Sequence, residues 1–238
     1  MQIESQPERI NWYGVNAIGK HLGQAVITGA LLFLGAGTTA WSWGWAFAGA
    51  TLAGWLGLSI ALALGNPALL NQRGQPVRRA TEGTKRWDLL LLALYTVLVL
   101  VQPFVAGLDR RFNGIEATVG AALIGNGLLL AGFGLLASAM VANRYFDPTV
   151  RIRAGQAGHI ATRGPYRIVR HPGYTGVILQ FIALPIGLGS GLALIPGLLG
   201  VGLLVLRTAL EDRTLHAELP GYAAYARRTR YRLIPGLW

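Results

Sequence analysis

Two segments of this sequence carry most of the side chains that could take part in chemistry. The first, residues 163–176, reads Arg-Gly-Pro-Tyr-Arg-Ile-Val-Arg-His-Pro-Gly-Tyr-Thr-Gly and precedes an apolar stretch. Pro172 suits the first turn of a helix because its φ is fixed and it lacks an N–H, and the residue before a proline avoids the α region. We therefore expect His171 at the N-cap of a helix that begins at Pro172.

The start of this helix has the chemistry of an anion site. Free N–H groups and partial positive charge at a helix N-terminus favour a bound anion. Three arginines of the same segment, Arg163, Arg167 and Arg170, would strengthen this field. A basic loop that flanks a membrane would have the same composition. The residues alone leave both interpretations open.

The second segment, residues 207–215, contains Arg207, Glu211 and Asp212. Arg207 and Glu211 are four residues apart, so they share a face of a helix. Arg before Glu supports a helix less than the reverse order, and carboxylates where a helix leaves a membrane cost desolvation. These points favour a functional role over an ordinary surface ion pair.

The composition is that of a membrane protein. Of 238 residues, 53% are hydrophobic and 13% are charged, against roughly 25% charged in soluble domains. The 33 glycines lie mostly within apolar stretches, as in helices that pack closely in a bilayer. The absence of cysteine excludes disulfides, cysteine zinc sites and thiol nucleophiles. Four scattered histidines without a His-Glu-x-x-His motif give no indication of a metal site.

The apolar stretches predict an all-α, polytopic integral membrane protein with about six transmembrane helices. The first four are each near the roughly 20 residues that a span needs and cover residues 22–39, 46–64, 89–108 and 117–142. The last two are shorter, and a glycine-rich turn joins them, so we expect an antiparallel helical hairpin of residues 174–188 and 192–208. A basic loop is expected at residues 71–88. The tail should continue as a helix to about Glu218, break at Pro220-Gly221 and form a short helix over residues 222–230.

The distribution of positive charge predicts the orientation. With the N-terminus in the cytoplasm and six spans, 19 of the 21 lysines and arginines are cytoplasmic, and only Arg110 and Arg111 are outside. We therefore expect both termini and the 143–172 loop on the cytoplasmic side of a bacterial or archaeal inner membrane. The net charge of +11 is then a topology signal, and nucleic acid is not an expected partner. Aromatic residues expected at the membrane interface are Trp12, Tyr13, Trp41, Trp43 and Trp45.

A single membrane domain covering residues 1–238 is expected, because no repeat or linker is evident. Up to Ala142 the apolar segments hold little polar content and no buried charged residue of the kind that ion pathways use. Almost every unusual residue follows Asn143. We therefore predict a transmembrane scaffold, residues 1–142, and a catalytic region, residues 143–238.

Taken together, the motifs resemble the isoprenylcysteine carboxyl methyltransferase family and, more loosely, the membrane phospholipid methyltransferases. The resemblance rests on Gly164-Pro-Tyr-Arg-x-x-Arg-His-Pro-x-Tyr-x-Gly176 followed by Glu211-Asp-x-x-Leu215. The endings Leu219-Pro-Gly-Tyr-x-x-Tyr225 and Tyr231-Arg-Leu-Ile-Pro235 are also similar. It covers roughly residues 143–238, and the earlier spans match only in being apolar.

The resemblance implies that S-adenosylmethionine binds in a cytoplasmic pocket between the basic loop and the hairpin. It places these residues in the cofactor pocket: His159, Ile160, Tyr166, His171, Pro172, Gly173, Tyr174 and Glu211. It makes Arg207 the catalytic residue, at the position where the family holds the acceptor's carboxylate. The acceptor would be a lipid-like or prenylated molecule that enters from the bilayer. This sequence departs from the family in having Asp212 where a second glutamate is usual, and in lacking a clear glutamine before His159.

The chemistry of these residues agrees with such a cofactor. Its carboxylate suits the arginines and the helix N-terminus, and its amino group suits Glu211. Aromatic rings can contact the adenine or the sulfonium. Transfer to a carboxylate needs no general base, so catalysis would rest on alignment and exclusion of water. Transfer to an amine would need a base, supplied by Glu211, Asp212 or a histidine.

Other functions remain open from the sequence. A phospholipid N-methyltransferase would share the motifs. A sterol-type membrane reductase has similar C-terminal helices and an Arg-His-Pro stretch, and it would bind NADPH. A non-catalytic membrane subunit or a transporter is the third class, and the apolar early spans disfavour transport.

Overall fold

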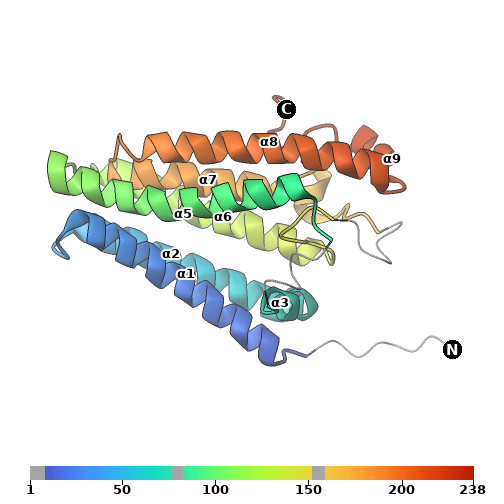
Figure 1. The fold of residues 1–238 in the computed structure, drawn as a ribbon, viewed down its shortest axis with the longest axis horizontal. Coiled ribbons are helices and arrows are strands. Elements are labelled where there is room, and N and C mark those ends of the chain that lie inside the picture. The colour runs from blue at the N-terminus through green and yellow to red at the C-terminus, as the bar shows by residue number, and fades with distance from the viewer. Residues whose placement is uncertain (1–8, 77–82, 152–158) are drawn as a thin grey trace.

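The computed structural model describes residues 9–76, 83–151 and 159–238, and within them the chain is helical, without a strand. The helices are α1 (Trp12–Ala36), α2 (Ser42–Gly65), α3 (Pro67–Arg73), α5 (Arg86–Asn113), α6 (Val119–Ala142), η1 (Gly164–Arg167), α7 (Pro172–Leu188), α8 (Leu194–Glu218) and α9 (Tyr222–Arg228). Figure 1 shows the long helices side by side in one bundle. The expected all-α fold is confirmed. Some charged residues of the predicted polar segments lie outside the described residues: Glu4, Glu8, Arg78, Arg79 and Arg153.

Five helices of the described chain are long and apolar enough to cross a membrane: α1, α2, α5, α6 and α8. The sixth expected span is α7, an apolar helix of 17 residues. At about 1.5 Å per residue it measures about 26 Å, a little less than the roughly 30 Å of a bilayer core. The chain is therefore a multi-pass membrane protein. The last two apolar segments form the expected hairpin: α7 ends at Leu188, is capped by Gly189 with φ 69°, and packs against α8.

Helix α1 begins ten residues before the expected apolar segment. The side chain of Asn11 caps it, accepting hydrogen bonds from the N–H groups of Tyr13 (2.9 Å) and Gly14 (3.4 Å). The apolar pattern did not predict the first two turns because they are too polar to resemble a membrane span. The capping residue Asn11 was the sequence signal that could have placed the start of this helix. Similarly, α3 lies in part of the expected basic loop, where Asn66 caps a helix that begins at Pro67.

The tryptophans after α1 do not all lie at a membrane interface. Trp45 is 57% exposed, as an interfacial residue would be, but Trp41 is only 2% exposed and belongs to the core. The prediction of a belt of alternating tryptophans is therefore wrong for Trp41. Alternation does not give a common face on a helix, and α2 begins at Ser42.

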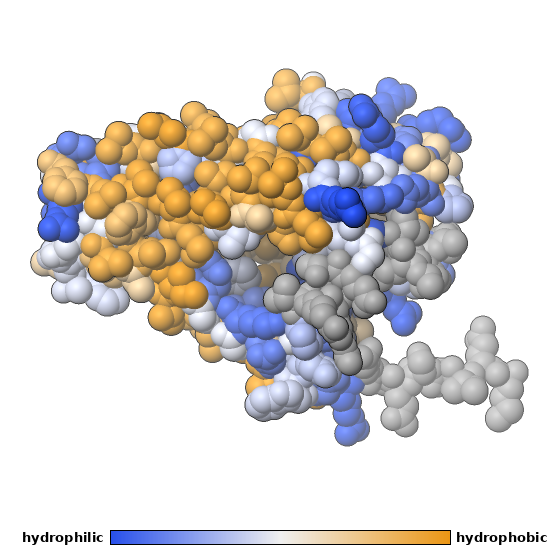
Figure 2. Space-filling view, in the orientation of Figure 1, coloured by the Kyte–Doolittle hydropathy of each residue, from blue (hydrophilic) through white to orange (hydrophobic). Residues whose placement is uncertain are grey.

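The polar segments gather at one end of the bundle. The start of α1, α3, the end of α8 and α9 lie at the right of Figure 1, and the turns that join α1 to α2, α5 to α6 and α7 to α8 lie at the left. On the face shown in Figure 2, apolar side chains cover the middle, and hydrophilic ones gather at the ends and over part of the lower helices. This arrangement is that of a bundle with an apolar belt and one large polar end.

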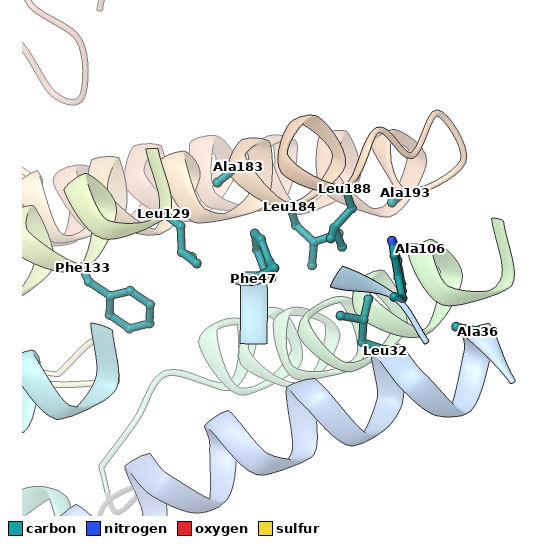
Figure 3. Packing of buried hydrophobic residues seen from close by; sticks show 11 residues of the cluster. Leu32, Ala36, Phe47, Ala106, Leu129, Phe133, Ala183, Leu184, Leu188 and Ala193 are labelled. Atoms are coloured by element: carbon teal, nitrogen blue, oxygen red, sulfur yellow. The ribbon is translucent and has the colours of Figure 1, made fainter. Parts of the chain in front are cut away.

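The largest core cluster joins residues from α1, α2, α5, α6 and α7 with Ala193, the residue before α8 (Figure 3). Phe47 of α2 lies among Leu129 and Phe133 of α6 and Leu184 of α7. Because the cluster draws on both halves of the sequence, the early helices and the later hairpin pack as one body. The polar end is thereby attached to a common core.

Helices α6 and α7 pack most extensively, and glycines make this possible. A Cβ on Gly132 would lie 2.6 Å from the carbonyl oxygen of Gly176, and one on Gly125 would collide with the backbone of Gly187. Such close approach of backbones is typical of helices in membranes. It sets the position of α7, whose first turn carries part of the motif.

Candidate active site

A cavity of about 300 Å³ lies where the polar end meets the bundle. Eight of the nine predicted site residues line it: His159, Ile160, Tyr166, His171, Gly173, Tyr174, Arg207 and Glu211. The ninth, Pro172, is fully buried beside them and does not line the cavity. The structure therefore brings the two motifs together around one space.

The start of α7 has the predicted geometry. His171 is the N-cap residue, with φ −124° and ψ 59°, and Pro172 is the first helical residue. The tail holds this turn in place, because the backbone N–H groups of Arg170 and His171 each donate to tail carbonyls at 2.9 Å, those of Tyr231 and Arg232. The His171 ring stacks against Tyr174 with the centroids 5.9 Å apart.

The three arginines of the motif do not form a free anion site, contrary to expectation. Arg163 and Arg167 are exposed and do not line the cavity. Arg170 lines it but is 8% exposed, and its guanidinium is held by Asp212, with Nε to Oδ1 at 2.9 Å and Nη2 to Oδ2 at 3.0 Å. Residue types alone could not reveal a partner 42 positions away.

Asp212 is the centre of a buried polar network. It is 1% exposed and accepts hydrogen bonds from Arg170, from Arg232 Nε at 2.9 Å and from the Tyr222 hydroxyl at 2.9 Å. His171 Nε2 lies 3.4 Å from the same carboxylate. Asp212 does not line the cavity. It joins the start of α7, the end of α8 and the tail, so its role is structural support of the site.

Glu211 has a different environment from its neighbour Asp212. Its Oε2 accepts a 2.5 Å hydrogen bond from the Tyr174 hydroxyl, and its Oε1 lies 3.9 Å from His171 Nδ1. Among the described residues it forms no ion pair with lysine or arginine. Asp147 is the other carboxylate that lines the cavity, and it is paired with Arg151 at 2.7 Å. Glu211 is thus the acidic lining residue best suited to a cationic ligand.

Arg207 pairs with Asp88, not with Glu211. Asp88 is 0% exposed and accepts hydrogen bonds from Arg207 Nε at 2.7 Å and Nη2 at 3.1 Å. Nη2 also donates to the carbonyl of Pro148 at 2.7 Å, and the guanidinium lies 5.3 Å from the centroid of the Tyr174 ring. The predicted span 89–108 itself holds no charged residue, but helix α5 extends past it at both ends and carries Asp88 into the interior. Asp109, at the other end of α5, is also buried, at 3% exposure.

Three of the residues that line the cavity are buried tyrosines: Tyr166, Tyr222 and Tyr225. Tyr225 donates its hydroxyl hydrogen to the carbonyl of Tyr166 at 2.9 Å, and Tyr222 donates to Asp212. Burial raises the pKa of Tyr225 to about 12. Burial also raises the pKa of Tyr166 and that of Tyr222, for which the Asp212 charge acts in the same direction. All three phenols are therefore neutral near neutral pH, and those of Tyr222 and Tyr225 donate hydrogen bonds.

Sequence reasoning missed the lining residues supplied by the first helices: His21, Trp55, Arg73 and Tyr95. Within the motif region it also missed Tyr145 and Phe146. An acidic residue in the first turn of an apolar helix, Asp88, was a readable signal, because it has to find a partner when buried. The six missed lining residues form no sequence pattern that would place them at the site.

The site holds a carboxylate without a lysine or arginine partner among the described residues, several aromatic rings and a helix N-terminus around one cavity. Such a set can bind a zwitterionic or cationic ligand with an aromatic part. Among residues 9–76, 83–151 and 159–238, no group of three or more His, Cys, Asp or Glu side chains could hold a metal ion. The side chains that line the cavity can bind such a ligand and align it.

Residues 123–217 match the model of the isoprenylcysteine carboxyl methyltransferase (ICMT) family. The resemblance seen in the motifs is thereby confirmed for this part of the chain. The match begins within α6 and ends within α8, so it starts earlier than expected and leaves out the tail motifs. A search of curated proteins found no match.

Proposed function

We propose that this membrane protein transfers a methyl group from S-adenosylmethionine to a lipid-like acceptor, with a carboxylate as the favoured acceptor. The match to a methyltransferase family over residues 123–217 supports the reaction class, since members of this family use S-adenosylmethionine. The observation that carries the cofactor assignment is Glu211. It is a half-buried carboxylate in the cavity that has no lysine or arginine partner among the described residues.

The lining residues fit the parts of this cofactor. Glu211 would hold the amino group, because a carboxylate gives a charge-assisted hydrogen bond to an ammonium. The first turn of α7, at Gly173, would receive the carboxylate. Tyr166, His159 and Ile160 would contact the adenosine or the sulfonium. When bound, the cofactor supplies an electrophilic methyl group.

The remaining residues would position the acceptor. Arg207 lies one helical turn before Glu211 on α8, about 5.4 Å nearer the apolar part of the bundle, where a lipid-like acceptor would enter. Its guanidinium is the lining group suited to the acceptor's carboxylate. A carboxylate is already ionised, so no proton has to be moved, and the site's task is alignment and exclusion of water.

We place the cavity on the cytoplasmic side. Support comes from the gathering of basic segments at one end of the bundle and from the positive-inside rule. Residues 1–238 would act as a single membrane domain, in which residues 143–238 hold the cofactor and the first helices complete the cavity wall.

The proposed function is tested with the purified protein, radiolabelled cofactor and extracted membrane lipids. Transfer of label from S-adenosylmethionine to a lipid fraction, identified by mass spectrometry, is the expected result. Binding of NADPH in place of S-adenosylmethionine would contradict the proposal and favour a reductase.

A second candidate, transfer to an amine, is favoured by the geometry of His21. Its Nδ1 lies 2.8 Å from Ser59 Oγ, whose own hydrogen is donated to the carbonyl of Trp55 at 2.8 Å. Ser59 must then accept from His21 Nδ1–H, which leaves Nε2 of the neutral ring as an acceptor. His21 lines the cavity and could take the proton that an amine releases. Methylation of phosphatidylethanolamine, and not of S-farnesyl cysteine, would decide for this candidate.

A further inference from the structure

We propose that Asp88 is a positioning residue for the acceptor, acting through Arg207, an inference that rests on the proposed function. Asp88 lies in the first turn of α5, outside residues 123–217, and nothing in the motifs points to it. Asp88 pairs with Arg207, which is 119 positions away in the chain, and the Asp88 side chain is fully buried.

The contacts of Asp88 fix three elements relative to one another. One oxygen, Oδ1, accepts from Arg207 Nε on α8, and Oδ2 accepts from Arg207 Nη2 and from the N–H of Val150 at 2.7 Å. Arg207 in turn donates to the carbonyl of Pro148. The carboxylate therefore holds α5, α8 and the 148–150 segment at the wall of the cavity. Two parallel hydrogen bonds define the plane of the guanidinium.

This arrangement leaves one part of Arg207 for a ligand. Nε and Nη2 are used by Asp88 and Pro148, whereas Nη1 makes no hydrogen bond among the described residues. Nη1 is also not one of the fully enclosed polar atoms, and Arg207 lines the cavity. Asp88 therefore orients the guanidinium so that its remaining donors face the acceptor.

Asp88 also changes the charge that an acceptor carboxylate meets. In the transfer, a carboxylate oxygen forms a bond to the methyl carbon, the carbon–sulfur bond breaks, and its electron pair stays on sulfur. An anion and a sulfonium cation become a neutral ester and a neutral thioether, and no proton moves. A full positive charge beside the carboxylate would stabilise the starting state more than the transition state, in which the negative charge is already fading. Asp88 neutralises the charge of Arg207. The guanidinium can then still orient the acceptor carboxylate through a hydrogen bond, but it stabilises the starting state less.

The signature of this role is a change of KM and kcat in the same direction. Asp88→Asn removes the negative charge while keeping a similar shape, so Arg207 becomes an uncompensated cation. With S-farnesyl cysteine as acceptor, we expect both KM and kcat to fall, each by about tenfold, because ground-state binding is strengthened at the expense of the transition state. Affinity for S-adenosylmethionine should not change. A merely structural role would raise KM or lower the amount of folded protein.

The same helix provides a matched control. Asp109→Asn removes another buried carboxylate of α5, one that accepts hydrogen bonds from Ser190 Oγ at 2.7 Å and Leu192 N at 3.1 Å, far from the cavity. It should lower thermal stability without the paired change in KM and kcat. Asp88→Glu keeps the charge but displaces the guanidinium, so KM for the acceptor should rise. This variant also keeps the inference testable if Asp88→Asn does not fold.

An equilibrium measurement separates this inference from the proposed function. Binding of S-farnesyl cysteine and of its methyl ester is measured without cofactor in the wild type, Asp88→Asn and Asp88→Glu. The expected result is a preference for the acid over the ester that grows about tenfold in Asp88→Asn. If the wild type transfers no methyl group but shows this pattern, the reaction is wrong and the role of Asp88 stands. Equal binding of acid and ester in all folded variants would overturn it, as would Asp88→Glu behaving as the wild type.

Discussion

Two adjacent carboxylates on α8, Glu211 and Asp212, have different surroundings. Asp212 is enclosed by Arg170, Arg232 and Tyr222, while Glu211 faces the cavity with only a tyrosine hydroxyl and a distant imidazole. The sequence predicted that both motifs meet, and it predicted Glu211 as a ligand-binding residue. The family resemblance chose Glu211 over Asp212, but the residue types could not show the reason, because the difference lies in partners supplied by α7 and the tail.

Loss of the Asp212 carboxylate should destabilise the protein strongly. Asp212→Asn leaves the guanidinium of Arg170 buried without its counter-ion, and breaking a buried pair typically costs about 3–5 kcal/mol. Thermal unfolding in detergent measures the effect. Glu218→Gln is the control, because its ion pair with Lys85 is exposed on both sides and should be worth less than about 1 kcal/mol. Equal stabilities of the two variants would contradict a network centred on Asp212.

At the scale of elements, the apolar segments predicted every long helix, but the ends of α1 and α5 extend beyond the apolar residues. Capping by Asn11 and burial of Asp88 extend these helices, and neither is part of a hydrophobicity pattern. The predicted cap at His171 and the hairpin of α7 and α8 are confirmed, because proline and glycine act locally. The contact of α6 with α7 depends on glycines whose partners only the fold brings near.

Adding one methyl group at the contact of α6 with α7 should be costly. Gly132→Ala places a Cβ 2.6 Å from the carbonyl oxygen of Gly176, so the two helices must separate. We expect a loss of about 1–3 kcal/mol, the usual cost of overpacking, seen as a lower unfolding temperature. Gly134→Ala, on the same helix with nothing within 4 Å of the added atom, should be neutral or stabilising. An equal loss in both variants would show that the contact is not close.

The tyrosine group predicts a loss of stability at alkaline pH. The pKa of Tyr225 is raised to about 12 by burial, above its ordinary value of about 10. The folded state keeps this proton longer than the unfolded state, so the contribution of Tyr225 is complete below about pH 10 and is lost as the pH rises to about 12. Unfolding temperature followed against pH should fall across this interval. Tyr225→Phe should show a smaller fall, and an identical profile would refute the assignment.

At the scale of the whole molecule, the two halves of the chain share one cavity. The sequence predicted a polytopic membrane protein with its chemistry after Asn143, and the helical fold and multi-pass character agree. The first helices are more than a scaffold, since His21, Arg73 and Tyr95 line the cavity and Asp88 holds Arg207. No local pattern could reveal this, because each contact joins positions far apart in the chain.

The orientation of the molecule is testable by reporter fusions. A fusion at the C-terminus and one near Arg110 should report opposite sides of the membrane, with the C-terminus in the cytoplasm. The reason is the concentration of lysines and arginines at the end of the bundle that holds the cavity. A C-terminus outside would contradict this, because a cytoplasmic cofactor could not then reach the site.

The role proposed for Glu211 is to bind the amino group of S-adenosylmethionine. Calorimetry of the purified protein measures this binding with wild type, Glu211→Gln and the surface variant Glu218→Gln. We expect wild type and Glu218→Gln to bind equally well. Glu211→Gln should bind about ten- to a hundredfold more weakly, the usual effect of losing a charge-assisted hydrogen bond. No binding by the wild type, or unchanged affinity in a folded Glu211→Gln variant, would contradict the claim.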